Sequence, residues 1–445
     1  MLSGTFAPLR SRDYRLLWVG QGVHAFALWM EQIARPFLVL AMTDGSAAHV
    51  GGVLAVRTVP QLFFGVFAGV VTDWFDRRAI LVITKVSVFI LSALFAALMV
   101  FGRLELWHVY VFQFIRGTFM AFDQPARQSM IASLVPPEQM VSGVALMSGT
   151  QNVMRILGST AGGLGIWVFG LTGAFVVVAI IYVGAVVTTW MISTTVQQKP
   201  QESGARAMAN GLVEGATWAW GNTTIRAILL LSFVYFTFGM AYTQVFVPLF
   251  AVQVMHIGEA GAGLMVSLTG AGALVSVLVI SSWQPTRVGI ALPFIVWTFG
   301  LMLVGFSLAT YLPNPYGLIL PFIFMALTGS TQTLFFSLSN ATMLTVAPPE
   351  MRGRVISLLS LDRGLMSLGG MGAGFLVELR GVQIAQITFG VVCIVGGLAV
   401  LLLYREFRIA RLAPAAIEAA GRAGRHGEGL AGAVAPSPAP ASRPR

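Results

Sequence analysis

The sequence predicts an all-α polytopic membrane protein with twelve transmembrane helices, arranged as two parallel six-helix repeats. Three observations predict this fold class: an apolar composition, twelve hydrophobic stretches of membrane-spanning length, and an internal repeat. Hydrophobic residues make up 56% of the 445 residues and charged residues only 10%, whereas ordinary globular chains carry about 25% charged residues. So few charged side chains cannot cover a soluble surface of this size. The composition therefore excludes a soluble enzyme, a secreted disulfide scaffold and a DNA-binding domain.

The cysteine and histidine content excludes two further kinds of site. The single cysteine, Cys393, lies in an apolar run, so the chain can form no intrachain disulfide and no cysteine-based metal cluster. The five histidines are scattered and lack the spacing of metal ligands. We therefore expect no bound metal and no cofactor.

Twelve hydrophobic stretches are long enough to cross about 30 Å of hydrocarbon. Only helices can satisfy their backbone polar groups in lipid without a closed barrel, and the stretches lack the alternation of barrel strands. No small-residue cleavage site follows the first stretch, so we interpret it as a retained helix rather than a signal peptide. The predicted spans are 15–41, 48–72, 79–101, 106–124, 141–168, 172–193, 226–252, 260–281, 288–310, 315–340, 354–377 and 382–404.

The distribution of basic residues predicts the orientation. Twelve spans place both termini on one side, and 19 of the 27 Lys and Arg residues fall on that side. The opposite side holds only Arg103 and Arg380, and the remaining six lie within spans. The positive-inside rule therefore predicts a multi-pass protein of the cytoplasmic (inner) membrane with both termini in the cytoplasm. The net charge of +10 reflects this topology rather than a nucleic-acid-binding surface.

Polar segments divide the chain into four parts. We expect an N-terminal six-helix half at 1–194, a cytoplasmic connecting loop at 195–225, a C-terminal six-helix half at 226–404 and a cytoplasmic tail at 405–445. In the loop, Leu212, Trp218 and Trp220 indicate a short amphipathic helix on the membrane surface. From about residue 411 the tail is rich in Ala, Gly, Pro and Arg, a composition typical of disorder.

An internal repeat relates the two halves at a constant offset of 212 residues, without a gap. Each half has six spans, an even number, so the two copies insert in the same direction. Parallel repeats of this kind build transporters whose halves rock around a substrate site between them. The matching positions are Gln32 and Gln244, Pro36 and Pro248, Gly51 and Gly263, Gly117 and Gly329, Pro136–Glu138 and Pro348–Glu350, Gly158 and Gly370, and Gly162 and Gly374.

Glycines spaced by four residues occur at equivalent places in the fifth and eleventh spans. The pairs are Gly158 with Gly162, which Gly163 follows, and Gly370 with Gly374. Small residues at this spacing let two helices approach closely, so we expect them to serve helix packing. Sealing or bending these helices during transport is a second interpretation.

Nine ionisable residues fall within the predicted spans, each at a cost of about 2.5–3.5 kcal/mol at mid-bilayer on insertion scales. A purely structural bundle has little use for so many charges, so we expect them to face a wet cavity and to pair with each other. The candidates for proton coupling or for lining this cavity are Glu31, Arg35, Arg57, Arg116, Arg155, Asp362 and Arg363.

Glu31 is the best-placed candidate for a proton carrier. It lies one helical turn from Arg35 on a common face, and the helical rise places it level in depth with Arg57. Nearby arginines stabilise its charged form, whereas desolvation stabilises its neutral form. The alternative is a static ion pair that holds the first two spans together.

The remaining ionisable residues of the first half have less demanding interpretations. Asp123 and Arg127 are one turn apart, so we expect a local salt bridge. Lys85 is close enough to the cytoplasm for its amine to snorkel out of the bilayer. We expect His24 to be a packed core residue.

The repeat offset shows that five charged residues of the first half have uncharged counterparts in the second. At this offset, Glu31, Arg35, Arg57, Arg116 and Arg155 correspond to Thr243, Val247, Thr269, Thr328 and Ser367. This favours coupling by the first half and a substrate surface supplied largely by the second. The candidate substrate-lining residues of the second half are Tyr242, Gln244, Gln332, Phe336 and Asn340.

The connection between the second and third spans, Gly69-Val-Val-Thr-Asp73-Trp-Phe-Asp76-Arg77-Arg78, resembles the cytoplasmic loop signature of the major facilitator superfamily. Together with segments 124–128, 134–136, 158–163 and 353–355, it is similar to the subgroup that contains the enterobactin exporter and the macrolide and tetracycline efflux permeases. The resemblance covers nearly all of residues 10–405 and implies the major facilitator fold. It also implies that Gly69, Asp73, Asp76, Arg77 and Arg78 form a gating loop, in which the aspartate of position 73 docks against a helix of the other half in the outward-facing state.

These observations predict a secondary active transporter. We expect proton-coupled export of an amphipathic small molecule, such as a drug, siderophore or secondary metabolite, by alternating access. The alternatives are an importer or lysophospholipid translocator on the same fold, and a non-transporting membrane scaffold or sensor. No nucleophile–base pair or phosphate-binding loop stands out, so we expect no catalytic residues and no enzyme. The expected partners are a small-molecule substrate and the lipid bilayer, with no nucleic acid and a monomeric state.

Overall fold

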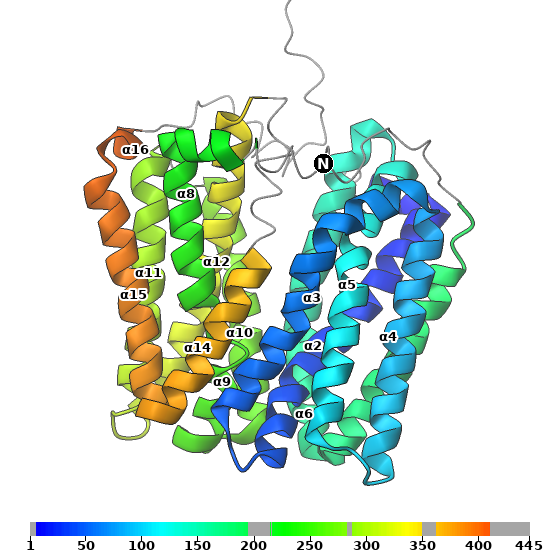
Figure 1. Cartoon of the computed structure of the whole chain (residues 1–445), viewed down its shortest axis with the longest axis horizontal. Helices are drawn as coiled ribbons and strands as arrows, with labels where there is room; N and C mark the ends of the chain where they lie inside the picture. Colours follow the sequence, from blue (N-terminus) through cyan, green and yellow to red (C-terminus); the bar gives the residue numbers. More distant parts are fainter. Residues whose placement is uncertain (1–5, 195–213, 215, 283–286, 349–361, 410–445) are drawn as a thin grey trace, which may run out of the picture.

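The computed structural model describes residues 6–194, 214, 216–282, 287–348 and 362–409, which form helices and their connections with no β-strand among them. The helices gather into two bundles that stand side by side (Figure 1). Eight helices in the described part of the chain are long and apolar enough to cross a membrane. The predicted all-α membrane architecture is therefore confirmed.

The N-terminal bundle follows the predicted spans closely. The predicted break between the fifth and sixth spans is a kink at Gly170, which has a φ of 69° inside one long helix. The elements are η1 (Ala7–Arg10), α2 (Arg12–Met42), α3 (Ala47–Trp74), α4 (Arg77–Val100), α5 (Leu106–Leu134), η2 (Pro137–Gln139) and α6 (Met140–Trp190).

The C-terminal bundle differs from the prediction at its first span, 226–252, which is broken by π-helical and 3-10 turns. A short helix at 216–221 precedes it, within the predicted amphipathic segment; Leu212 lies outside the described residues. The elements are α8 (Thr223–Val234), η3 (Tyr235–Gly239), η4 (Met240–Tyr242), α9 (Phe246–Leu249), η5 (Phe250–Val254), α10 (Gly258–Ser282), α11 (Val288–Ala309), α12 (Tyr316–Val346), α14 (Asp362–Arg380), α15 (Val382–Leu403) and α16 (Arg405–Ile409).

Short polar residues start several of these helices. The side chains of Ser11, Ser46, Asp76 and Asn222 each accept a hydrogen bond from a backbone N–H in the first turn of α2, α3, α4 and α8. Such caps satisfy donors that the helix itself leaves free. At the other end of the chain, α16 packs against α11 through the fully buried Phe407. The predicted tail thus begins with a packed helix, and residues 410–445 lie outside the described part.

The internal repeat is visible in the packing within each bundle. A Cβ atom built on Gly117 of α5 would lie 2.0 Å from the carbonyl oxygen of Arg57 in α3. A Cβ atom built on Gly329 of α12 would lie 1.9 Å from the carbonyl oxygen of Thr269 in α10. The 212-residue offset relates the first pair of residues to the second. The same close crossing of two helix backbones therefore occurs once in each half.

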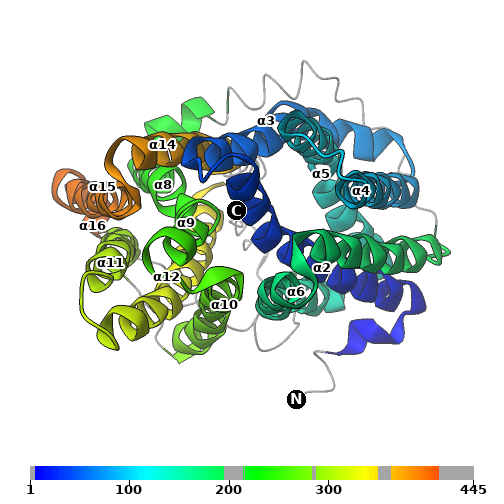
Figure 2. The ribbon, with the colours of Figure 1, turned by 90° about the horizontal axis from the view of Figure 1, so that it is seen from below.

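The contacts between the halves also come in repeat-related pairs. α3 packs against α14, and α6 packs against α10. Gly51 lies against the backbone of Gly370 in the first contact, and Gly263 lies against the backbone of Ser159 and Gly163 in the second. Seen from below, α3 and α14 run side by side at one edge of the interface (Figure 2).

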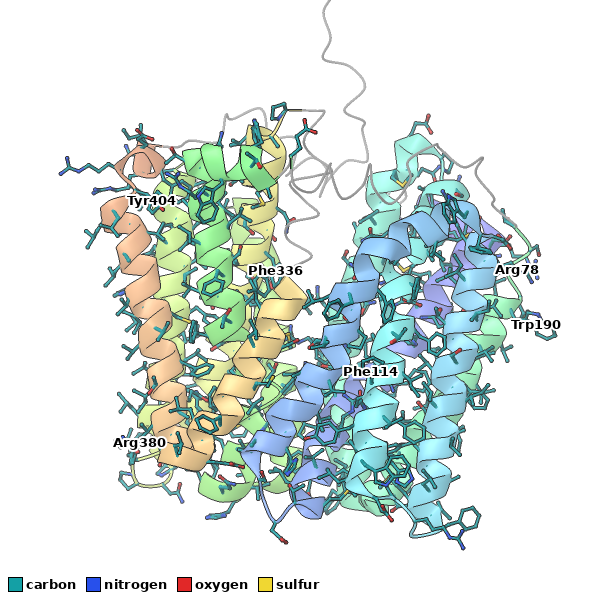
Figure 3. The ribbon with its side chains drawn as sticks, viewed as in Figure 1. Arg78, Phe114, Trp190, Phe336, Arg380 and Tyr404 are labelled. Atoms are coloured by element: carbon teal, nitrogen blue, oxygen red, sulfur yellow. The ribbon has the colours of Figure 1, made fainter. Side chains whose placement is uncertain are left out.

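The two ends of the molecule differ in how closely the halves meet. We call the end with the α3–α4 connection and α16 the inner end, and the end with the turn at 43–46 the outer end. The halves approach at the outer end, and their ribbons diverge toward the inner end (Figure 1). Arg78, Trp190 and Tyr404 lie at the inner end, and Arg380 lies at the outer end (Figure 3).

Candidate functional site

Glu31 is the centre of a buried charged cluster in the N-terminal half. Its two carboxylate oxygens accept hydrogen bonds from Arg35, one turn along α2, and from Arg116 of α5. Tyr182 of α6 donates to Glu31 at 3.4 Å and also accepts a bond from Arg116. All four side chains are buried. We call Glu31, Arg35, Arg116 and Tyr182 the Glu31 cluster.

The geometry of this cluster holds Glu31 as a carboxylate. Both of its oxygens face guanidinium groups at hydrogen-bonding distance, and charge-assisted bonds of this kind are about twice as strong as neutral ones. A proton added to Glu31 removes the acceptor of one or both guanidiniums. Because a buried charge without its partner is strongly destabilising, protonation would force these side chains to rearrange.

Arg57 of α3 was predicted at the same depth as Glu31, but it is not among the residues that form hydrogen bonds to Glu31. Its guanidinium lies within electrostatic range of Glu31, Arg35 and Arg116. Its Nε and Nη1 atoms have no hydrogen-bond partner among the described residues, although the side chain is only 8% exposed. Arg57 therefore offers two donors that the described side chains of the cluster do not use.

Arg155 of α6 bridges the two halves. Its guanidinium donates to Thr269 Oγ1 of α10 at 2.7 Å and to Gln332 Oε1 of α12 at 3.2 Å. It also lies 5.1 Å from the centre of the Trp29 ring, a cation–π contact. These partners are neutral, and Arg155 forms no ion pair with any side chain that the structure describes.

A second ion-pair group lies toward the inner end of the N-terminal half. Lys85 of α4 forms an ion pair with Asp123 of α5 at 2.7 Å, and Arg127 is 3.5 Å from the same carboxylate. The predicted Asp123–Arg127 bridge is thus present. The expectation that Lys85 snorkels was wrong: it is 4% exposed, because Asp123 provides a buried partner. His24 is buried and packs against the Tyr182 ring, with 5.4 Å between ring centres.

The C-terminal half presents aromatic rings instead of charges. Tyr235 stacks on Phe335 with ring centres 4.5 Å apart, and Phe236 contacts Phe336 at 5.3 Å. Among the predicted lining residues, Tyr242 is buried against Phe299 rather than lining an open surface.

Two predicted lining glutamines reach the contact between the halves. Gln244 Nε2 donates to Gln32 Oε1 at 3.4 Å. These residues are partners under the repeat offset, so their contact marks the pseudo-twofold axis. Gln332 contacts Arg155 of the other half. Asn340 instead donates to the Phe336 carbonyl of its own helix at 2.8 Å.

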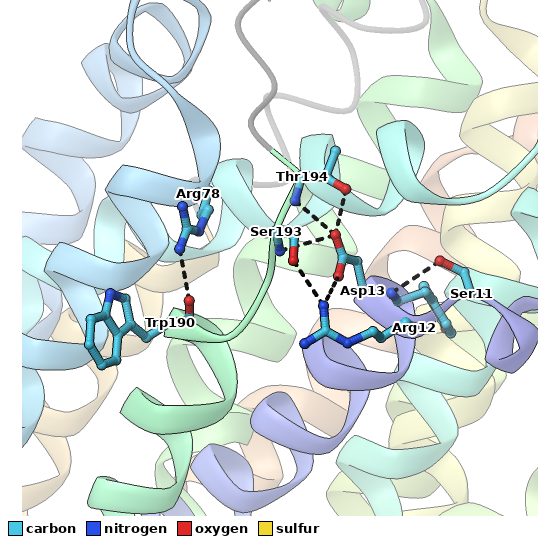
Figure 4. A network of polar contacts seen from close by, with 8 residues as sticks. Ser11, Arg12, Asp13, Arg78, Trp190, Ser193 and Thr194 are labelled. Carbon is cyan, nitrogen blue, oxygen red and sulfur yellow. Dashed lines mark hydrogen bonds and ion pairs between the residues drawn. The ribbon is translucent and has the colours of Figure 1, made fainter.

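The predicted gating loop ties α4 to its neighbours at the inner end. Asp76 caps α4, Arg77 Nη1 donates to Ser133 Oγ of α5 at 2.9 Å, and Arg78 Nη2 donates to the Trp190 carbonyl at 2.8 Å (Figure 4). The side chains of Asp73, Asp362 and Arg363, the surroundings of Gly69 and the start of the predicted eleventh span, near Gly353, lie outside the described set.

A second polar network at the same end fastens α2 to the end of α6. Asp13 accepts hydrogen bonds from the backbone N–H groups of Ser193, at 3.1 Å, and Thr194, at 2.8 Å, and from the Thr194 hydroxyl (Figure 4). All residues of this network belong to the N-terminal half. The network therefore connects helices within that half and forms no contact with the described residues of the other half.

The predicted packing glycines lie at close helix contacts. Gly158 and Gly162 face the Phe26 and Met30 carbonyls of α2, within the same half. Gly163 faces the Glu259 carbonyl of α10, and Gly370 and Gly374 face α3, so these three lie at contacts between the halves.

Sequence reasoning missed Tyr182 as a member of the Glu31 cluster. An aromatic residue in an apolar span is ordinary, and its sequence context carries no signal of a hydroxyl aimed at a carboxylate. The expected contact of Glu31 with Arg35 is present, but the second guanidinium comes from Arg116 rather than from Arg57, which sequence reasoning had placed at the same depth. Depth along a helix fixes the level of a residue but not the direction it faces.

Comparisons with known proteins identify the family of this two-half helical chain. A family model described as transmembrane secretion effector matches residues 3–420, nearly the whole chain. The chain belongs to this family. It is a major facilitator transporter, not an enzyme.

Individual relatives agree with this assignment. The chain is 22% identical to the staphyloferrin A transporter of Staphylococcus aureus, over 80% of this chain and 87% of that protein. It is 24% identical to macrolide efflux protein A of Streptococcus pyogenes, over 77% and 83% of the two chains. The solved structure of the POT family transporter PepTSo superimposes with a TM-score of 0.73 at 12% identity, covering 90% and 99% of the chains, and it shares the fold.

Proposed function

We propose that this protein exports an amphipathic small molecule across the cytoplasmic membrane in exchange for protons, with its inner end in the cytoplasm. The observation that carries the proposal is the placement of Glu31, a buried carboxylate held by Arg35 and Arg116 in one half of a two-half transporter. The names of two relatives, a staphyloferrin A transporter and a macrolide efflux protein, support a small-molecule cargo.

Contacts at the outer end support a state in which cargo enters from the inner side. Ser46 Oγ donates to Glu378 Oε1 at 2.5 Å, and the Ala48 backbone N–H donates to the same oxygen at 3.1 Å. Gln253 Nε2 donates to the Gly45 carbonyl at 3.4 Å. These hydrogen bonds join the two halves, so they must break before the outer end can open.

The proton enters this cycle through the Glu31 cluster. When Glu31 is charged, its bonds to Arg116 and Tyr182 join α2 to α5 and α6. Protonation releases Arg116, and the packing of these helices changes because a freed guanidinium must find new partners. Cargo bound between the halves would then meet a different surface in the two protonation states, which is the basis of exchange.

The cargo surface would come largely from the C-terminal half. Phe236 and Phe336 supply apolar area, and Gln244 and Gln332 supply hydrogen-bonding groups at the contact between the halves. A binding surface of rings with a few placed polar groups suits a molecule with an apolar body and polar substituents.

Transport by inside-out membrane vesicles tests this function. With an acidic lumen, the vesicles should accumulate a fluorescent dye or macrolide, and collapse of the pH gradient should release it. Glu31→Gln should bind the compound but accumulate it no further than wild-type vesicles without a gradient. The exposed Glu138→Gln is the matched control and should transport normally. Gradient-driven accumulation by Glu31→Gln would remove Glu31 from this role, and accumulation only in right-side-out vesicles would indicate import.

A further inference from the structure

A small cavity lies against Glu31 inside the N-terminal half, away from the contact between the halves. It measures about 20 Å³ and is enclosed by residues of α2, α4, α5 and α6. This volume suffices for one water molecule. Its polar lining consists of Glu31, Ser92, Gln113 and Arg116.

Three polar atoms of this lining have no hydrogen-bond partner among the described residues. They are Ser92 Oγ, Gln113 Oε1 and Arg116 Nε, on side chains that are 8%, 3% and 3% exposed. A buried water needs two to four polar partners. A hydroxyl, an amide oxygen and a guanidinium N–H offer both acceptors and a donor, which a water molecule can satisfy together.

The cavity is closed toward the outer end by a layer of aromatic rings. Phe95 contacts Phe112 and Phe175, with ring centres 5.4 Å and 5.1 Å apart. Phe95 lies one turn nearer the outer end than Ser92, and Phe112 one turn nearer than Arg116, so these rings cover the outer side. All three are buried. We call Phe95, Phe112 and Phe175 the phenylalanine layer.

Toward the inner end, a series of buried polar groups continues from Glu31 through the same half. Tyr182 bonds to Glu31, His24 packs on the Tyr182 ring, and the Lys85–Asp123 ion pair follows. The cavity beside Glu31 is therefore bordered by rings on its outer side, and polar groups follow Glu31 on its inner side. A proton crosses polar groups and water readily but not a dry layer of rings, so the two sides differ in proton access.

We propose that the cavity binds one water molecule that relays the proton of Glu31, and that the phenylalanine layer is the outer barrier of a proton route running through the N-terminal half alone. This inference rests on the proposed coupling at Glu31. The water accepts the carboxyl proton on one lone pair and passes another proton onward, so it remains water and Glu31 becomes charged. Cargo passes between the halves and need not displace this water.

Filling the cavity tests the relay. Ser92→Val removes the hydroxyl and occupies the space with methyl groups, and Ser232→Val is the matched control, because Ser232 is a buried serine of α8 whose hydroxyl also lacks a described partner. Infrared difference spectroscopy of purified protein, at a pH low enough to protonate Glu31, reports hydrogen–deuterium exchange of its carboxyl group, with Glu31→Gln identifying the band. We expect Ser92→Val to slow this exchange at least tenfold and to leave dye binding unchanged, whereas Ser232→Val exchanges at the wild-type rate.

A second variant tests the barrier and guards against misfolding of the first. Phe175→Ala should let protons leak across proteoliposomes without cargo, at a rate that Glu31→Gln in the same background abolishes. Wild-type exchange in Ser92→Val, or a tight membrane in Phe175→Ala, would overturn the inference. Its failure differs from failure of the proposed function, since the latter appears as gradient-driven transport by Glu31→Gln itself.

Discussion

The two halves of the transporter share a backbone plan but differ in what fills it. The crossing of α3 with α5 at Gly117 is repeated by α10 with α12 at Gly329. In the first half this crossing lies beside Arg57 and Arg116, whereas the second half has Thr269 and Thr328 there. The duplication therefore conserved helix packing, and the interior chemistry diverged around it.

The difference shows how the first half can couple transport to protons while the second half can recognise the cargo. Thr269, the counterpart of Arg57, is the acceptor for Arg155 from the opposite half. The hydroxyl of Thr328, the counterpart of Arg116, donates to the Phe324 carbonyl of its own helix, at 2.6 Å. The described interior of the second half holds aromatic rings where the first half has ion pairs, and its first span includes a π-helical turn that carries Tyr235 and Phe236.

The largest difference in stability between equivalent substitutions in the two halves is expected at Arg116 and its counterpart Thr328. Arg116→Leu leaves Glu31 with one guanidinium in a buried site, which should destabilise the protein by about 3–5 kcal/mol. Thr328→Val at the equivalent position removes one local hydrogen bond and should cost about 0.5–1.5 kcal/mol. Thermal unfolding of purified protein in detergent measures both. The triple variant Glu31→Leu, Arg35→Leu and Arg116→Leu should recover much of the loss, because all three charges that pair with one another are then removed together. Equal losses in the two halves would contradict the comparison.

A smaller loss of stability, equal in the two halves, is expected at the helix crossings of Gly117 and Gly329. Gly117→Ala and Gly329→Ala each push a methyl group into a facing carbonyl, so each should cost about 1–3 kcal/mol through forced backbone shifts. Gly149→Ala is the control, since a Cβ atom there meets nothing within 4 Å; it should be neutral or stabilising by up to about 1 kcal/mol. If one half tolerated the substitution and the other did not, the common backbone plan would not hold.

The sequence predicted the features that depend on periodicity and offset. Hydrophobic length indicated the long helices of the described residues, the 212-residue offset identified the two copies, and the one-turn spacing paired Glu31 with Arg35. These features depend on residue spacing along the chain, either within one helix or at the constant repeat offset. They can therefore be predicted from the sequence alone. The irregular first span of the second half was missed, because π-helical turns keep the apolar composition of a straight helix.

Lateral arrangement could not be predicted in the same way. Which helices face each other decides that Glu31 bonds to Arg116 and Tyr182 and that Lys85 meets Asp123. Depth and charge alone left several pairings equally open. The Glu31 water cavity also depends on three helices meeting α2 at one level, and no single segment carries a signal for it.

The smallest expected effect tests the recognition role of the second half. Phe336→Ala removes one ring from a contact with Phe236, and aromatic pairs contribute about 0.5–1.5 kcal/mol, which corresponds to a roughly two- to tenfold rise in the cargo KM. The pH dependence of transport should stay that of the wild type, because the Glu31 cluster is untouched. Phe114→Ala is the control: this ring of α5 is exposed on the surface of the first half (Figure 3), and its loss should leave KM unchanged. A shifted pH profile with an unchanged KM in Phe336→Ala would mean that coupling extends into the second half, and the division of roles between the halves would fail.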